Sequence, residues 1–447
     1  MPGAERLWGG ETEKAIANFP ISGEVVPRPV IHWLGRIKSA SALVNVELGL
    51  LDPDIGERIA VAGHRVAAGE FDDQFPVDVF QTGSGTSTHM NANEVVASLA
   101  GPDVHPNDHV NICQSSNCVF PSAVHLAALE AVVTELVPAL GQLQLALAAK
   151  AAEFADIAKA GRTHLMDAVP VTLGQEFGGY ASQVDHGAAR VLATTERLSQ
   201  VPLGGTATGS GLNVHPEFAA RVRDRLSAET GLAVRAPDDP FEATGARDAL
   251  VELSGALKTV AVSLLKIAND VRLLGSGPRT GLRELRLPEL QKGSSMMPGK
   301  VNPVIPEVVT QVAAQVVGND AAVTMAGSHG QLELNAFVPL MARNVLGSIA
   351  LLTSAARVFA ERCVDGLEAD LEGCRSSGEL SLAAATALNP VLGYELVARL
   401  VSEAHESGRT LREVGVEHGV DEHVLDTVLD PLALARGGIL ASPPAGG

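Results

Sequence analysis

The sequence is poor in aromatic residues, which make up 3% of its 447 positions, whereas apolar residues make up 46%. Interiors with so few rings must be aliphatic. That composition favours helices packed through Leu, Ala and Val over a β-sandwich, which usually relies on aromatic and β-branched residues. At this length the chain is too long for one small core, so two or three domains are expected.

Positive charge is also scarce, since 33 basic residues face 52 acidic ones and the formal net charge is −19. This balance argues against nucleic acid and acidic membrane surfaces as partners. Any anionic substrate must therefore be attracted by a local positive site.

Cysteine is rare, and Cys113, Cys118, Cys363 and Cys374 show neither Cys-x-x-Cys spacing nor a metal-binding pattern with histidine. They indicate reduced cytosolic thiols. The opening MPGAERLWGG lacks the apolar core of a signal peptide, and no run of about 18 apolar residues is evident. We therefore expect a soluble cytoplasmic protein.

Two series of apolar residues at alternating spacings of three and four predict long helices. The first follows Ser115 and contains Pro138, which should bend the helix. The second ends at Gly275-Ser276-Gly277-Pro278, a strong stop signal. Their members are Leu126, Leu129, Val133, Leu136, Leu140, Leu143 and Leu147, then Leu250, Leu253, Leu257, Val260, Leu264, Ile267, Val271 and Leu274.

Further long helical segments fit residues 172–200 and 307–358, and a shorter one fits Pro29 to Leu51. Helices this long cannot bury their apolar faces alone. We expect a mixed helical N-terminal domain over 1–115 and a central bundle of long helices over 116–360. Residues 361–447 should form a small helical domain with a frayed tail from Gly437. A plain coiled coil is the alternative, but long coiled coils rarely carry so many Gly-rich loops.

The most informative stretch is 293–303, GSSMMPGKVNP, a loop with two hydroxyls, one cation and an amide. Asn302 is a good N-cap and Pro303 a good first helical residue, so a helix should begin there. The free N–H groups of that helix, beside Lys300, favour an anion. The stretch therefore predicts a carboxylate or phosphate site with a hydroxyl as a possible base.

A P-loop is the rival interpretation of this stretch, and the spacing argues against it. Five residues separate Gly293 from Gly299, where a P-loop has four. Val301 also stands where Ser or Thr would hold magnesium.

The same stretch closely resembles the signature of the fumarase/aspartase superfamily, GSSxMPxKxNP. Three further runs are similar to the family in the same order: QTGSGTSTHMNANEV at 81–95, HPNDHVNICQSSN at 105–117 and GRTHLMDAVPVTLGQE at 161–176. LLGSGPRTGLRE at 273–284 and ELNAFVP at 333–339 extend the match to nearly the whole chain. Within the superfamily the pattern is closest to the class II fumarate hydratases.

The resemblance implies an all-α fold of three domains, in which the middle helices of four chains form one tetrameric helical core. Each active site of that homotetramer would combine loops from three subunits. The implied reaction is the reversible hydration of fumarate to (S)-malate in the tricarboxylic acid cycle, without metal or organic cofactor.

The resemblance also assigns roles to individual residues. It makes Ser294 the base. It makes His164, paired with Glu307, the group that handles the proton of water. Substrate binding falls to Ser84, Gly85, Thr86, Ser115, Ser116, Asn117, Thr163, Ser295, Lys300, Val301 and Asn302. A secondary anion site falls to His105, Pro106, Asn107 and Asp108. Without the resemblance, plainer roles fit as well: a Ser/Gly turn at 83–86, a helix cap at 114–117, an ordinary polar histidine, and serines that only bind substrate.

The implied chemistry suits these residue types. A proton beside a carboxylate is weakly acidic, so its removal needs donors for the extra negative charge, which Lys300, Asn302 and helix N-termini supply. The leaving group on the opposite face needs a proton, available through His164 and Glu307. A serine is a poor base unless its alkoxide is stabilised.

The chain departs from the family pattern at three positions. His89 stands where fumarases have Asn, and Cys118 and Val119 stand where they have Asp and Thr. These changes could leave hydration intact or alter the nucleophile. A sister lyase that adds ammonia, an amine or another nucleophile to fumarate is therefore the alternative, and a catalytically idle helical scaffold is a third hypothesis.

Overall fold

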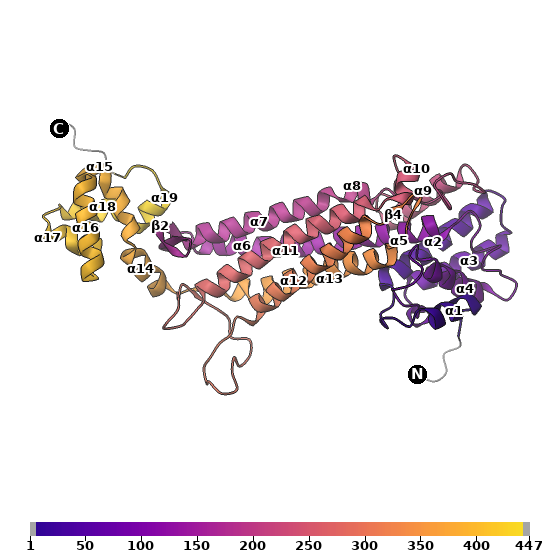
Figure 1. Ribbon diagram of the computed structural model, residues 1–447, viewed down its shortest axis with the longest axis horizontal. Coiled ribbons are helices and arrows are strands. Elements are labelled where there is room, and N and C mark those ends of the chain that lie inside the picture. Colours follow the sequence, from indigo (N-terminus) through magenta and orange to yellow (C-terminus); the bar gives the residue numbers. More distant parts are fainter. Residues whose placement is uncertain (1–5, 441–447) are drawn as a thin grey trace. The chain divides into compact units, whose positions relative to one another are not determined.

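The structure is a computed structural model that describes residues 6–440, and these residues are organised mainly as helices (Figure 1). The chain divides into two compact units. The first unit takes the chain up to Ala139, then Gly187–Val262 and Val312–Ser354. The second takes Leu140–His186, Ser263–Gln311 and the chain from Ala355. The predicted all-α fold is confirmed, whereas the predicted division into three domains remains a prediction.

The helices are α1 (Gly10–Asn18), α2 (Arg28–Glu47), α3 (Pro53–Ala67), α4 (Thr86–Ala100), α5 (Ser116–Ala131), α6 (Val137–Glu153), α7 (Leu173–Ala193), α8 (Thr195–Leu198), α9 (Phe218–Thr230), α10 (Pro240–Gly245), α11 (Asp248–Leu274), α12 (Val304–Gly327), α13 (Val338–Arg362), α14 (Leu371–Leu380), α15 (Asn389–Leu392), α16 (Tyr394–Ser407), α17 (Leu411–Glu417), α18 (Glu422–Val428) and α19 (Pro431–Arg436). The strands are β1 (Ala158–Thr163), β2 (Met166–Thr172), β3 (Leu285–Arg286), β4 (Gly330–Gln331), β5 (Leu334–Asn335) and β6 (Glu368–Ala369). They form the antiparallel pairs β1–β2, β3–β6 and β4–β5.

In the first unit, α2 packs against α3, α4, α5 and α9. Helices α2 and α3 meet at a pair of glycines. A methyl group on Gly35 would lie 2.6 Å from the Gly63 carbonyl oxygen, and one on Gly63 would lie 2.7 Å from that of Gly35. Only residues without a side chain allow this approach, which seats α2 deep in the unit, with Trp33, Leu34 and Ile37 fully buried.

Both predicted apolar series lie on helices. All eight members of the second series, from Leu250 to Leu274, are buried on α11. The first series runs through α5 and α6, and between them residues Val132–Leu136 form one π-helical turn directly before Pro138. A π turn is one way in which a helix accommodates a nearby proline without N–H, whereas the bend predicted at Pro138 remains a prediction.

Polar bonds join neighbouring long helices inside the first unit. Ser254 on α11 donates to Asp320 on α12 at 2.8 Å, and Asn319 on α12 donates to Ser348 on α13 at 3.0 Å. Because these groups are buried, each bond fixes the register of one helix against the next.

In the second unit, the β1–β2 hairpin packs against α14 and α19, and the C-terminal helices enclose a small core of Leu388, Leu400, Val414 and Leu425. Figure 1 shows these helices in yellow beside β2. The expected C-terminal helical region is therefore present. Part of the tail from Gly437, residues 441–447, lies outside the described residues.

Three expected boundaries were wrong. Residues 307–358 do not form one helix, because the β4–β5 hairpin separates α12 from α13. The long helix expected over 172–200 ends at Ala193. Helix α12 begins at Val304, one residue after Pro303, since the Pro303 carbonyl accepts from Glu307 N and thus serves as the cap.

Two helical stretches, Ser116–Glu153 and Val338–Gly366, are long and apolar enough to span a membrane by length and composition alone. In their most apolar windows 61% and 67% of the residues are buried inside the protein. Both carry polar residues such as Glu130, Thr134 and Asn344. Helices in the core of a folded protein can have the same length and composition, and the burial of these two stretches fits a core position.

Candidate active site

The first unit brings together hydroxyl groups from two predicted motifs. Thr86 Oγ1 lies 2.7 Å from Ser84 Oγ and 2.8 Å from Ser116 Oγ. Thr86 is the first residue of α4 and Ser116 the first residue of α5. Three hydroxyls and two helix N-termini therefore converge, and helix N-termini with free N–H groups favour anions.

Close packing fixes the start of α4. Gly85 has φ +78°, and a methyl group on it would lie 2.3 Å from the Phe120 ring of α5. Next to it, a methyl group on Gly83 would lie 1.7 Å from the Ala336 carbonyl oxygen, while Val338 N donates to Gly83 O at 3.0 Å. Two matched runs far apart in sequence, at 81–95 and 333–339, thus hold each other in place.

The start of α5 is capped by its own sequence. Ser115 Oγ accepts from Asn117 N at 3.3 Å, so the helix-capping role of this serine is present. The Asn117 amide donates to the Ala207 carbonyl at 2.9 Å, which ties the cap to the neighbouring Gly-rich loop. Capping and anion binding use the same helix end and are compatible.

The second unit holds the 293–303 loop. Gly293 N donates to the Lys300 carbonyl at 3.0 Å, and Asn302 Nδ2 donates to the Gly293 carbonyl at 2.7 Å, which closes the loop at its base. A methyl group on Gly293 would lie 2.1 Å from the Lys300 carbonyl oxygen. Ser295, Lys300 and Val301 are exposed on this loop.

The Ser294 hydroxyl oxygen accepts two backbone N–H groups, from Met296 at 3.1 Å and from Met297 at 3.0 Å. Donors directed at an oxygen stabilise it in the charged form. This geometry supplies part of what a serine base requires.

Thr163 and His164 belong to the β1–β2 hairpin that precedes α7. They lie at the tip of the β1–β2 hairpin, where His164 and Leu165 have φ +57° and +61°. A two-residue turn with both residues left-handed matches the right-handed twist of a hairpin. The turn projects His164 into solvent.

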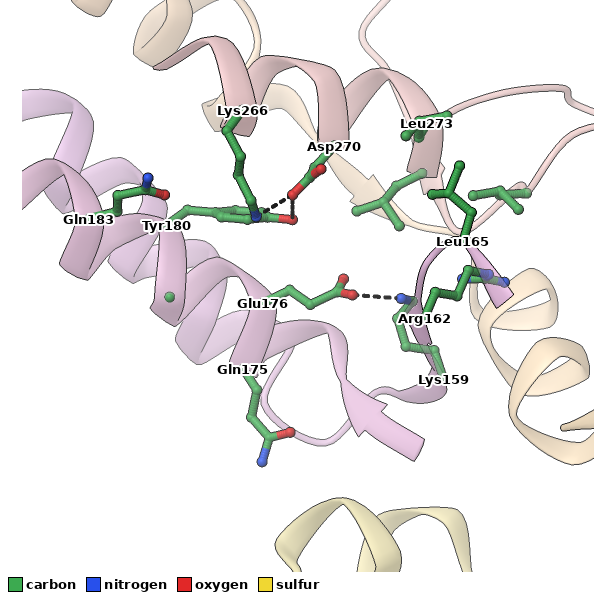
Figure 2. Close-up of a pocket in the computed structure, with 13 residues that line it drawn as sticks. Lys159, Arg162, Leu165, Gln175, Glu176, Tyr180, Gln183, Lys266, Asp270 and Leu273 are labelled. Atoms are coloured by element: carbon green, nitrogen blue, oxygen red, sulfur yellow. Dashed lines mark hydrogen bonds and ion pairs between the residues drawn. The ribbon is translucent and has the colours of Figure 1, made fainter. Parts of the chain in front are cut away.

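A buried ion-pair network anchors this hairpin. Lys159 Nζ lies 2.8 Å from Glu176 Oε1 and 3.1 Å from Glu284 Oε2, and Arg162 donates to Glu284 Oε1 at 2.8 Å. Figure 2 shows Lys159 and Arg162 of β1 facing Glu176 of α7 across a pocket. Burial raises the pKa of Glu176, and Lys159 opposes that shift.

The other end of the pocket is closed by α11. Tyr180 of α7 donates to Asp270 at 3.0 Å, and Lys266 lies over the Tyr180 ring at 4.5 Å from its centre (Figure 2). Burial raises the pKa of Tyr180, so the phenol remains a donor. These contacts fix α7 against α11 behind the hairpin that carries His164.

Some predicted partners are not joined within the chain. Glu307 lies in the first turn of α12, and among residues 6–440 no hydrogen bond or ion pair connects it to His164. His105 and Asp108 form their own turn, with Nδ1 to Oδ2 at 3.0 Å, and His105 N donates to the His109 ring. The secondary anion site at 105–108 remains a prediction.

Sequence reasoning missed Lys38 and Glu284, both fully buried. Lys38 interrupts the apolar run of α2, and such a residue is more often an exposed or snorkelling lysine. Glu284 lies in the matched run 273–284, but its partners Lys159 and Arg162 are more than a hundred positions away, so spacing could not reveal them.

Comparisons with known proteins place these motifs in one family. A lyase family model matches residues 3–318, and a model of the fumarase C C-terminus matches residues 385–436. The class II fumarate hydratase of Mycobacterium tuberculosis is 53% identical over 442 residues, covering 97% of this chain and 93% of the relative. The mitochondrial fumarate hydratase of Saccharomyces cerevisiae is 49% identical over 428 residues, covering 93% and 88%.

Solved structures agree. The class II fumarase of Schistosoma mansoni has a TM-score of 0.94 at 36% identity, covering 97% of this chain and 96% of that one. The native fumarate lyase:delta crystallin structure from Brucella melitensis has a TM-score of 0.90 at 44% identity, covering 96% of each chain. The chain is a helical lyase. It belongs to the fumarase/aspartase superfamily, and the curated relatives compared above are fumarate hydratases.

Proposed function

We propose that this protein is a lyase that hydrates fumarate reversibly to (S)-malate, by addition and elimination of water on opposite faces of the substrate. The relatives named above are called fumarate hydratase or fumarase, and each of them matches this chain over nearly its whole length. The sister lyase that uses ammonia or an amine is not favoured by these relatives.

The observation that carries the proposal is the hydroxyl cluster of Ser84, Thr86 and Ser116 at the meeting of two helix N-termini. Partial positive charge from both helices, together with a chain of hydrogen-bonded hydroxyls that can donate at its end, suits a carboxylate of a small dianion. In a protein of net charge −19 such a local site is what an anionic substrate requires.

In malate dehydration, the Ser294 alkoxide removes the proton beside a carboxylate, and the electron pair spreads into that carboxylate. Lys300, Asn302 and the helix N-termini stabilise the added charge. His164, oriented by Glu307, delivers a proton to the departing hydroxyl, so water leaves and the double bond forms. Hydration runs through the same steps in reverse.

We also propose that the enzyme is a cytoplasmic homotetramer in which three subunits contribute loops to each active site. Support comes from α12, whose Ala314, Val317, Gly318, Ala321 and Met325 are exposed. Such a surface of small and apolar residues, without charge, is suited to close contact with another copy of the chain. The two members of the His164–Glu307 pair would then come from different subunits. Light scattering of the purified protein tests the assembly.

The activity is tested by following the ultraviolet absorbance of fumarate with the purified protein. Loss of fumarate in buffer alone, with malate as product, supports the hydratase. Loss that requires ammonia or a small amine supports the sister lyase, and no loss under either condition supports an idle scaffold.

A further inference from the structure

Lys38 of α2 is fully buried, and its ammonium group meets three polar acceptors. Its Nζ lies 2.8 Å from Gln114 Oε1, 2.9 Å from His89 Nε2 and 3.3 Å from Asn111 Oδ1. An ammonium has three donors, so these contacts satisfy it fully. None of them carries negative charge.

Among the described residues no carboxylate forms an ion pair with Lys38. Charged groups on the neighbouring helices have other partners: Arg36 of α2 pairs with Glu130 of α5, Glu94 of α4 is bonded to residues 9–12, Arg58 and Arg65 of α3 pair with Asp103 and Glu70, and Arg221 and Arg225 of α9 pair with Glu47. The titratable groups that face Lys38 are His89 of α4 and the buried Cys118 of α5.

The lysine connects the two helix starts that form the hydroxyl cluster. His89 lies one turn inside α4, and its backbone N–H donates to the Gly85 carbonyl at 2.9 Å, directly before Thr86. Gln114 immediately precedes Ser115, the cap of α5. Lys38 therefore contacts the chain beside both ends of the candidate carboxylate site.

This network accommodates two protonation states. As an ammonium, Lys38 donates to His89 Nε2. As a neutral amine, it can instead accept from a protonated Nε2 of the other imidazole tautomer. Burial lowers the pKa of Lys38 to about 7. Burial and the neighbouring Lys38 hold the pKa of His89 well below its ordinary value.

Cys118 explains why the cation lacks a counter-charge. Its thiol donates to the Ser115 carbonyl at 3.3 Å. Burial raises the pKa of the thiol, so that it stays neutral.

We propose that Lys38 is a positioning residue whose buried positive charge strengthens dicarboxylate binding at the hydroxyl cluster, and that the loss of one proton from it weakens that binding. This inference rests on the proposed function, because it takes a dicarboxylate as the ligand. Cys118 sets the pH at which the change occurs by leaving Lys38 without an anion.

The test measures the Kd of succinate, an unreactive C4 dicarboxylate, by calorimetry from pH 5.5 to 9.5 in the full-length protein. In the unchanged protein Kd should rise about three- to tenfold as pH passes through neutrality, since one buried charge near the site is lost. Cys118→Asp supplies an anion beside Lys38 and should move this rise to higher pH by about one to three units. Cys118→Asn has the shape of Cys118→Asp without its charge, so it should leave the pH of the rise in Kd unchanged.

Lys38→Met provides a second measurement. It should abolish the rise and fix Kd near the weak, high-pH value of the unchanged protein. A Kd independent of pH, no binding of succinate at any pH, or the same profile in Cys118→Asp and Cys118→Asn would each overturn the proposal. The hydration assay is run separately, so that pH-dependent succinate binding without fumarate hydration would reject the proposed function and retain this inference.

Discussion

Arg162 Nη1 donates to Oε1 of Glu284 at 2.8 Å, which ties the strand leading into His164 to the loop that follows α11. The Glu284 side chain is fully buried and also faces Lys159. Removing one partner of a buried ion pair costs about 3–5 kcal/mol, because the remaining charge is left without compensation.

Glu284→Gln should therefore lower the stability of the protein and reduce kcat, because the hairpin that carries His164 loses its anchor. Thermal unfolding and fumarate turnover measure the two effects. Glu289→Gln changes an exposed carboxylate a few residues along the same loop and should affect neither. Equal behaviour of the two variants would contradict the anchoring role.

Ser294→Ala should reduce kcat by about a hundredfold or more, the scale on which a general base contributes. Its oxygen accepts two backbone N–H groups and contributes little to packing, so a dicarboxylate inhibitor should bind almost as before. Steady-state kinetics and inhibitor titration separate these effects. Turnover close to that of the unchanged protein would remove the base assignment.

Gly293→Ala should open the base of the same loop, because the new methyl group would meet the Lys300 carbonyl oxygen at 2.1 Å. We expect a large loss of activity with a small change in melting temperature, since much of the loop is exposed. Gly299→Ala meets no atom within 4 Å and suffers only from its φ of +78°, a cost of about 1 kcal/mol. The Gly293 variant should be the less active; the reverse order would be inconsistent with this geometry.

His89→Asn tests whether this position selects the nucleophile. The side chain is 2% exposed and bonded to Lys38. Asn also offers an acceptor, so we expect water to remain the nucleophile and no activity with ammonia to appear. A change in the ratio of water to ammonia addition would instead give His89 direct control of the reaction.

The stability of the protein should depend on the titration of Lys38. Its pKa is about 7 in the folded protein against 10.5 ordinarily, so between these values the unfolded chain binds more protons. The free energy of unfolding should therefore gain a contribution that rises with pH from about 7 to about 10 and is absent below. Denaturant unfolding at pH 6 and 9 should show this increment in the unchanged protein and lose it in Lys38→Met.

The sequence was informative where a pattern has one structural solution. The series from Leu250 to Leu274 could only be one face of a long helix, and the runs around Ser84 and Ser115 gave helix N-termini with hydroxyls. The hairpin tip was missed because His164 and Leu165 adopt left-handed conformations that turn rules assign to Gly, Asn or Asp. The Lys38 network was missed because its members come from separate elements and none has a distinctive spacing.

Hydration of fumarate is measured most directly by the ultraviolet absorbance of fumarate in ammonia-free buffer. The absorbance should fall until fumarate and malate reach equilibrium, adding ammonia should change nothing, and Ser294→Ala should stop the fall. Absorbance that stays constant in buffer alone, or that falls only when an amine is present, would contradict it.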